Sequence, residues 1–196
     1  RLLRAPYEIT AELGFELAVA RYSPTDPDRQ LVLALANCNY QRGREQAHKW
    51  IDLQRNFFFE DTSLSAELLC SPHADTRAYA RQSLKLMTFG DAPAQALIAR
   101  VVALLQSLGE NEQQRAAEIC QSLLELFHQP LRRIGPEVIR DLLAHSLVEV
   151  QQFAGDLVLN HETLSQHPPD DVLRAQLNSD EEEERSSGVR IIGQLT

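Results

Sequence analysis

The stretch Leu142–Val158, which reads LLAHSLVEVQQFAGDLV, contains one complete helical hairpin pattern. A leucine pair ends one apolar helix, a few small or polar residues make a turn, and a second helix begins at Glu149. Apolar residues in that second helix recur every three or four positions, which is the period of an amphipathic α-helix. The same unit recurs in looser form along the chain and predicts a stack of helical hairpins.

Five copies of this unit align without gaps when each is anchored on the last leucine of its first helix. The anchors are Leu3, Leu69, Leu105, Leu143 and Leu177. Ten residues further on lie Leu13, Tyr79, Arg115, Phe153 and Ser187. The next position always holds a small residue, namely Gly14, Ala80, Ala116, Ala154 and Gly188. Fourteen residues after the anchors lie Leu17, Ser83, Ile119, Leu157 and Ile191. A small side chain between apolar neighbours lets two helices approach closely.

The spacing of the anchors fits one helical pair per unit. From Leu69 onwards the anchors are 36, 38 and 34 residues apart. The longer gap between Leu3 and Leu69 leaves room for a further unit. We expect that unit to be anchored on Ala36, with Ala47, Trp50 and Ile51 in its second helix.

Each second helix opens with a polar signature. Asp75-Thr76-Arg77 precedes Ala78 and Ala80, Glu149-Val150-Gln151 precedes Ala154, and Glu183-Glu184-Arg185 precedes Gly188. This pattern resembles HEAT repeats, in which a turn is followed by an acid, an apolar residue, an arginine and an alanine-rich helix. The resemblance covers essentially the whole chain. In that family the acid and the arginine commonly form a ladder between neighbouring units, a pattern from which Gln151 departs.

The resemblance implies a fold rather than an activity, because repeat families are defined by packing positions and serve many functions. It implies an all-α fold, a right-handed α-solenoid of about five to six HEAT-like hairpins that forms a single array over residues 1–196. An ordinary helical bundle is the alternative architecture. Because the chain begins at Arg1 and stops directly after a helical pattern, we expect it to be a fragment of a larger protein.

Apolar periodicity and the positions of proline and glycine predict eleven helices. They cover residues 2–22, 28–39, 44–58, 64–69, 74–87, 94–108, 112–127, 137–144, 148–161, 170–177 and 181–195. In the first of them Ile9, Leu13, Leu17 and Ala20 form the apolar row. No segment has the alternating pattern of a strand.

Composition and charge limit the classes of partner. Hydrophobic residues make up 43% of the 196-residue chain, which is typical of soluble globular domains. No apolar run approaches the roughly 18 residues needed to span a bilayer. The net charge is −9, and residues 99–196 carry sixteen acidic against eight basic side chains. This balance disfavours nucleic acid and acidic membranes as the main ligand.

The sequence contains no motif for catalysis, for a cofactor or for a metal. None of the six histidines has the spacing of a helical zinc pair, and there is no phosphate-binding glycine loop. Cys38, Cys70 and Cys120 are far apart in apolar patterns, which predicts buried free thiols of a cytoplasmic protein. The acidic run 180–184 is interpreted as a solvated helix start. An enzyme would need a cluster of acids or histidines that the fold assembles.

We therefore expect a non-enzymatic scaffold that binds another protein, or another domain of its own parent chain, through a concave face lined by the second helices. The residues predicted to contact the partner are Arg77, Arg81, Arg115, Arg185 and Arg190. The alternative is nucleic-acid binding by a basic and aromatic patch near the N-terminus. Its basic residues are Arg42, Arg44 and Lys49, with a second group at Arg132 and Arg133. Its aromatic residues, Trp50 and the run 57–59, fit a core face better than a stacking platform.

Overall fold

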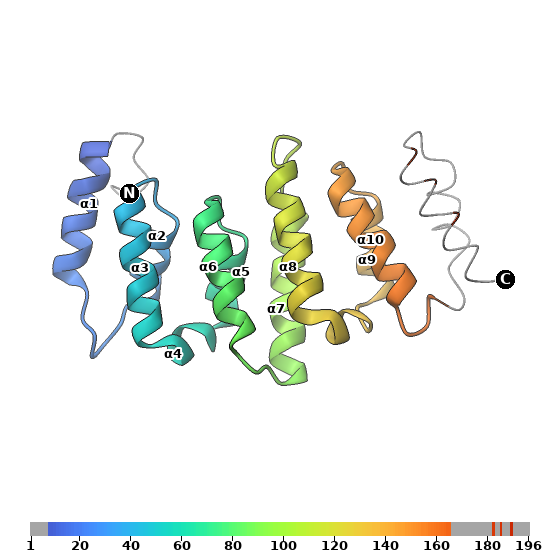
Figure 1. The fold of residues 1–196 in the computed structure, drawn as a ribbon, viewed down its shortest axis with the longest axis horizontal. Coiled ribbons are helices and arrows are strands. Elements are labelled where there is room, and N and C mark those ends of the chain that lie inside the picture. The colour runs from blue at the N-terminus through green and yellow to red at the C-terminus, as the bar shows by residue number, and fades with distance from the viewer. Residues whose placement is uncertain (1–7, 166–181, 183–184, 186–188, 190–196) are drawn as a thin grey trace. The chain divides into compact units, whose positions relative to one another are not determined.

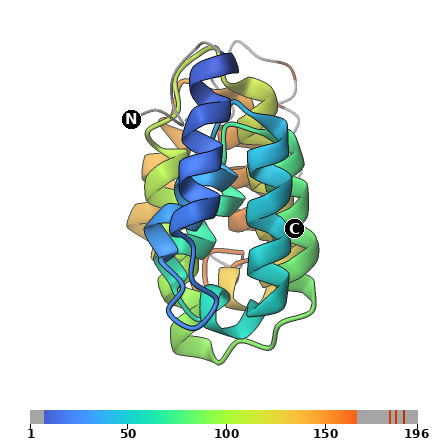
Figure 2. The same ribbon diagram turned by 90° about the vertical axis from the view of Figure 1, so that its left-hand side faces the viewer.

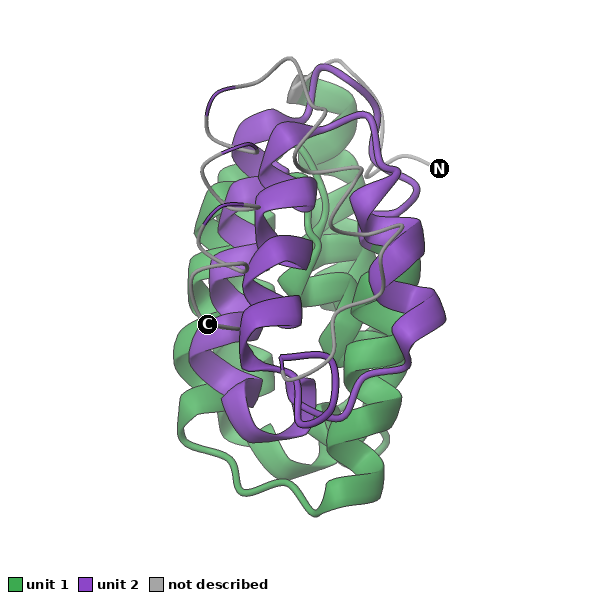
Figure 3. Ribbon diagram, turned by 90° about the vertical axis from the view of Figure 1, so that its right-hand side faces the viewer, with its two compact units in different colours: residues 1–104 green, residues 105–196 purple. Residues whose placement is uncertain are grey.

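The computed structural model describes residues 8–165 together with Glu182, Arg185 and Val189 (Figure 1). These residues are all-helical as predicted, with ten helices and no strand among residues 8–165. The chain divides into two compact units, Arg1–Leu104 and Leu105–Thr196, which Figure 3 distinguishes by colour. In the described part, no helix is both long enough and apolar enough to cross a membrane.

The first unit is built from helical hairpins that stand side by side. Its described helices are α1 (Glu8–Arg21), α2 (Arg29–Ala36), α3 (Gln41–Leu53), α4 (Arg55–Phe59), α5 (Thr62–Leu69), α6 (Ala74–Lys85) and all but the last residue of α7 (Asp91–Leu105). Helices α2 and α3 form one hairpin, and α5 and α6 form the next. Because α2 packs against α5 and α3 against α6, first helices lie on first helices and second helices on second helices. Helix α1 packs against α2, and Figure 2 views the unit from the side of α1.

The two hairpins begin and end in the same way. The carboxylates of Asp28 and Asp61 cap α2 and α5, where each accepts hydrogen bonds from two backbone N–H groups of the first turn. Each first helix has eight residues, and Ala36 ends α2 as Leu69 ends α5. Ala36 therefore occupies the anchor position that the sequence alignment assigns to it.

The second unit repeats the hairpin with a longer helix beside it. Helix α8 (Gln113–Leu131) packs against α10 (Val148–Asn160), and α10 forms a hairpin with α9 (Pro136–Leu143). Proline occupies the first turn of α9, where its missing N–H costs nothing. In the described part, the small residue of each aligned unit is buried as predicted: Gly14, Ala80, Ala116 and Ala154.

Two of the predicted helices differ most from the observed ones. The helix predicted over 44–58 is divided into α3 and α4 at Gln54, whose backbone leaves the helical region and whose side chain donates to Pro24 O at 2.8 Å. Helix α8 runs beyond its predicted end through a kink at Phe127, three residues before Pro130. The break at Phe127 accommodates a proline that lacks the N–H of a regular helix. The predicted helices 170–177 and 181–195 lie outside the described residues, apart from Glu182, Arg185 and Val189.

The buried face of α1 is the opposite of the expected one. Its apolar row is largely exposed, with exposed fractions of 83% for Ile9 and about half for Leu13 and Leu17. The face that packs on the rest of the unit instead carries small residues, including Ala11 and Ala18. Small residues allow close approach of α1, and this packing leaves the larger side chains outside.

Candidate functional site

A hydrogen bond from the second helix to the preceding turn recurs in three hairpins. Both positions are counted from the last residue of the first helix. The donor is the side chain eight residues after it, and the acceptor is the backbone carbonyl oxygen of the residue two positions after it. The bonds are Arg44 Nη1 to Cys38 O at 3.0 Å, Arg77 Nη1 to Ser71 O at 2.7 Å, and Gln151 Nε2 to His145 O at 2.6 Å. We call this contact the hairpin clamp. Gln151, which departs from the expected arginine, makes the same contact as the two arginines.

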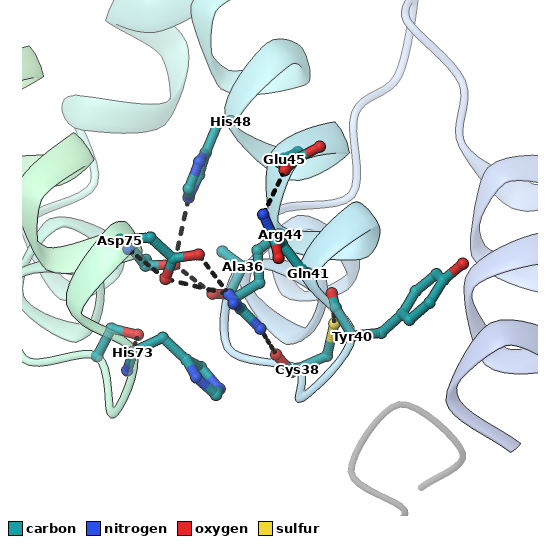
Figure 4. A network of polar contacts seen from close by, with 11 residues as sticks. Ala36, Cys38, Tyr40, Gln41, Arg44, Glu45, His48, His73 and Asp75 are labelled. Atoms are coloured by element: carbon teal, nitrogen blue, oxygen red, sulfur yellow. Dashed lines mark hydrogen bonds and ion pairs between the residues drawn. The ribbon is translucent and has the colours of Figure 1, made fainter. Parts of the chain in front are cut away.

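Arg44 also joins the two hairpins of the first unit (Figure 4). Its Nε lies 2.8 Å from Oδ2 and 3.1 Å from Oδ1 of Asp75, at the start of α6. Burial alone would raise the pKa of Asp75, but the hydrogen bonds and positive charge of Arg44 outweigh this effect and lower it. This ion pair joins the second helices of two neighbouring hairpins.

His48 continues the contact between α3 and α6. Its Nε2 lies 3.2 Å from Thr76 Oγ1, which donates its single hydrogen to Ala36 O at 2.8 Å. The threonine hydroxyl must therefore accept, and His48 Nε2 carries a proton. Burial lowers the pKa of His48, because the charged form is poorly solvated there, and this outweighs the opposing effect of Asp75.

An aromatic pair completes the contact between α3 and α6, which we call the α3–α6 seam. The rings of His48 and Tyr79 are stacked, with centroids 4.1 Å apart and planes inclined by 12°. Tyr79 Oη lies 3.1 Å from His48 O and 3.0 Å from Asp52 Oδ1, and Arg55 donates to the same carboxylate oxygen at 2.8 Å. Burial raises the pKa of Tyr79, so its hydroxyl is a neutral donor. The polar groups of the seam thus bond mainly to one another and hold α3 beside α6.

We call the exposed outer side of α3 and α6 the second-helix face. Its exposed residues include Arg42, Glu45, Lys49, Asp52 and Leu53 on α3, and Gln82, Lys85 and Leu86 on α6, the last of which caps α6. Leu53 and Leu86 have exposed fractions of 74% and 70%. Each lies seventeen residues after the end of its own first helix, so they occupy the same position in the two hairpins. Charges of both signs surround them.

Of the predicted partner-binding arginines, the structure describes Arg77, Arg81, Arg115 and Arg185. Arg77 is buried, with 6% of its surface exposed, and serves as a hairpin clamp. Arg81 is half-buried on α6, and Arg185 is exposed. Arg115 is half-buried in the second unit and forms an ion pair with Glu112. Arg190 lies outside the described residues.

The basic residues of the alternative patch differ in their exposure and partners. Arg44 is paired with Asp75, whereas Arg42 and Lys49 are exposed. In the second unit, Arg132 donates to Asn160 O at 3.2 Å and Arg133 lies 3.7 Å from Glu162.

The aromatic residues of the patch belong to the core, as the amphipathic pattern indicated. Trp50 is stacked on Tyr22, with centroids 3.8 Å apart, and Phe58 and Phe59 are fully buried. Phe57 is covered by the guanidinium of Arg29, whose Cζ lies 3.9 Å above the ring. These rings are therefore not presented as a stacking platform.

His161 and the three cysteines are buried side chains. His161 is buried, with Nε2 2.8 Å from Ile134 O and Nδ1 accepting from Thr163 N and Leu164 N, each at 3.2 Å. The three cysteines are buried and free, as predicted. Among the described residues, no three histidine, cysteine or acidic side chains gather as a metal ligand set. Of the run 180–184, Glu182 alone is described, and it is exposed.

Sequence reasoning missed the two leucines and the pairing of His48 with Tyr79. The leucines could have been found by extending the sequence alignment to the seventeenth residue after the anchors Ala36 and Leu69. The ring stack depends on how α3 packs against α6. Comparison of the chain with protein-family models, with curated proteins and with solved structures finds no match.

Proposed function

We propose that this chain is a non-enzymatic scaffold of the cytoplasm, a HEAT-like right-handed α-solenoid that binds another protein or another domain of its parent chain. The second-helix face is its contact surface and forms part of the concave side of the solenoid. Such an array offers a long preformed surface, so that binding orders few additional residues.

The repeated construction of the hairpins supports the solenoid. Successive hairpins of the first unit pack first helix on first helix and second helix on second helix. Their aspartate caps and hairpin clamps occupy equivalent positions. Units that repeat both their contacts and their orientation extend by stacking.

The observation that carries the proposed contact surface is the equivalence of Leu53 and Leu86. Large exposed apolar side chains at one repeat position, surrounded by charges of both signs, suit the apolar centre and polar rim of a protein interface. A phosphate backbone instead favours a surface of one sign. Here Arg44 is already neutralised by Asp75, which weakens the nucleic-acid alternative.

The test is a pull-down from source-cell lysate with the full chain as bait, at low and moderate salt, with and without nuclease. We expect one protein to be retained under all four conditions. Leu53→Ser/Leu86→Ser should reduce its recovery at least about tenfold, since each leucine loses apolar burial worth more than 1 kcal/mol. The matched control is Val19→Ser, which changes one exposed apolar residue on α1 and should leave recovery unchanged.

Two outcomes would reject the proposed function. Recovery of nucleic acid that is lost at moderate salt would favour the basic patch, with Arg42 and Lys49 as the first residues to replace. Equal loss of the partner in Leu53→Ser/Leu86→Ser and in Val19→Ser would mean that the second-helix face is not the contact surface.

A further inference from the structure

We propose that the exposed row of α1, formed by Ile9, Leu13 and Leu17, is a docking surface for one amphipathic helix of a partner protein, whose apolar stripe is flanked by lysine or arginine. The exposed fractions of the three side chains are 83%, 49% and 53%. This surface is separate from the second-helix face, and the proposal does not rest on the function proposed above.

The spacing of the row selects a helix as its occupant. Ile9, Leu13 and Leu17 recur every four residues, so they form a ridge along about two turns of α1. A ridge of this kind packs between the side chains of another helix whose apolar residues recur every three or four positions.

The internal repeat also indicates a helix as the occupant of this row. The alignment places Leu13 and Leu17 at the positions of Phe153 and Leu157 in α10. Those two residues are each 2% exposed in a helix that both α8 and α9 contact. The equivalent positions of α1 remain about half exposed. A further helix packed on α1 would cover them as they are covered in α10.

Charge selects the kind of helix. Glu12 and Glu16 are exposed and immediately precede Leu13 and Leu17, so they form an acidic border along one edge of the row. A basic residue beside the partner's apolar stripe would meet this border favourably, whereas an acidic one would be repelled. A second copy of the chain would bring the same acidic border against it, which disfavours self-association through this row.

The test uses two synthetic helical peptides of about 18 residues, long enough to form a helix on binding. Both carry the same leucine stripe, flanked by lysine in one peptide and by glutamate in the other. Binding to the full chain is followed by fluorescence anisotropy. We expect the lysine peptide to bind, and Leu13→Ser/Leu17→Ser to weaken it at least about tenfold. Glu12→Lys/Glu16→Lys should reverse the preference in favour of the glutamate peptide.

Matched controls separate this surface from the rest of the first unit. Leu53→Ser/Leu86→Ser alters the second-helix face, and Glu67→Lys reverses an exposed charge on α5. Neither should change the affinity for the lysine peptide by more than about twofold, because neither residue lies on α1. Circular dichroism checks that every variant keeps the helical content of the parent chain.

The proposal is overturned if neither peptide binds, if both bind with equal affinity, or if the controls weaken binding as much as the α1 variants do. Analytical ultracentrifugation of the chain alone gives an independent outcome. A dimer that Leu13→Ser/Leu17→Ser dissociates would identify a second copy as the occupant and would also overturn it. All these results are independent of the lysate experiment, so either proposal can fail without the other.

Discussion

At the residue scale, Gly43 shows how closely α3 approaches the turn before it. A Cβ atom at this position would lie 2.8 Å from Cys38 Sγ and 3.3 Å from Leu35 Cδ2. Both neighbours are fully buried and have little room to move. Alanine at Gly43 would gain about 1 kcal/mol in helix propensity, but the contact with sulfur costs more than this gain.

We therefore expect Gly43→Ala to lower the free energy of unfolding by about 1–3 kcal/mol, measured by urea denaturation of the full chain. Gly90→Ala is the control, because the nearest atom to its added Cβ is Pro93 Cδ at 3.8 Å. Adding Cys38→Ala to Gly43→Ala should recover part of the loss, since it removes the sulfur. A stabilised Gly43→Ala protein would contradict the close approach.

The buried imidazole of His48 gives stability a dependence on pH. Its pKa in the folded chain lies below the ordinary value of 6.5, so the unfolded chain binds the proton more readily. The neutral imidazole of His48 makes its full contribution to the free energy of unfolding above pH 6.5. This contribution decreases as the pH falls from there towards the pKa of His48 in the folded chain. The nearby charges of Asp75, Asp52 and Glu45 favour the protonated form but do not outweigh burial.

We expect His48→Gln, which keeps an N–H donor for Thr76, to reduce the fall in unfolding free energy between about pH 6.5 and 5. Urea denaturation at several pH values measures it. His73 also has a pKa lowered mainly by burial, so part of the dependence should remain and should disappear in the double variant. An unchanged slope in His48→Gln would show that His48 is protonated as easily in the folded chain as in the unfolded one.

At the scale of the elements, the hairpin clamp fixes the second helix against its turn with either of two side chains. Arginine serves in the two hairpins of the first unit, and Gln151 serves in the second unit. What the position requires is a long N–H donor rather than a charge. The carbonyl that it satisfies is partly withdrawn from water, so losing the donor costs free energy.

We expect Gln151→Met, which keeps the length but removes the donor, to lower the free energy of unfolding by about 1 kcal/mol. Gln151→Arg should retain most of the stability, because arginine makes this contact elsewhere in the chain. The exposed Gln106→Met is the control, with an expected change within about 0.5 kcal/mol. Equal losses in the methionine and arginine variants would show that this carbonyl needs glutamine itself.

The buried side of a helix was predictable from the sequence where the buried residues occupy the aligned positions of the repeat. Ala80, Ala116 and Ala154 are buried where the alignment places a small residue. The prediction was wrong for α1, where periodicity identified the helix but not its buried face. The pattern of Ile9 and Leu13 resembles that of a core row, and only the packing on α2 distinguishes the two faces.

The candidate site was less predictable, because it depends on distances between helices. Arg44 is a basic side chain in the sequence, and its neutralisation by Asp75, 31 residues away, requires α3 and α6 to be adjacent. Arg77 has the same residue type and helical setting as an exposed arginine, yet it is buried as a clamp. Charge on a helix therefore does not by itself identify a contact residue.

At the scale of the whole molecule, the chain divides into two compact units, Arg1–Leu104 and Leu105–Thr196. Each has its own buried aromatic residues, such as Phe58 in the first unit and Phe153 in the second. A helix depends mainly on the neighbours that it contacts for stability, so a defect in one compact unit should have its largest effect within that unit.

We expect Phe153→Ala to increase amide hydrogen exchange in α8, α9 and α10 much more than in α2, α3, α5 and α6. Removing a buried phenylalanine costs about 3–5 kcal/mol, enough to raise exchange through local opening by at least about a hundredfold. Phe58→Ala, in a residue that is equally inaccessible, should give the reverse pattern. Exchange that rises to the same extent in all these helices in either variant would mean that the two units unfold as one. A continuous cooperative array would then describe the chain better than two units of separate stability.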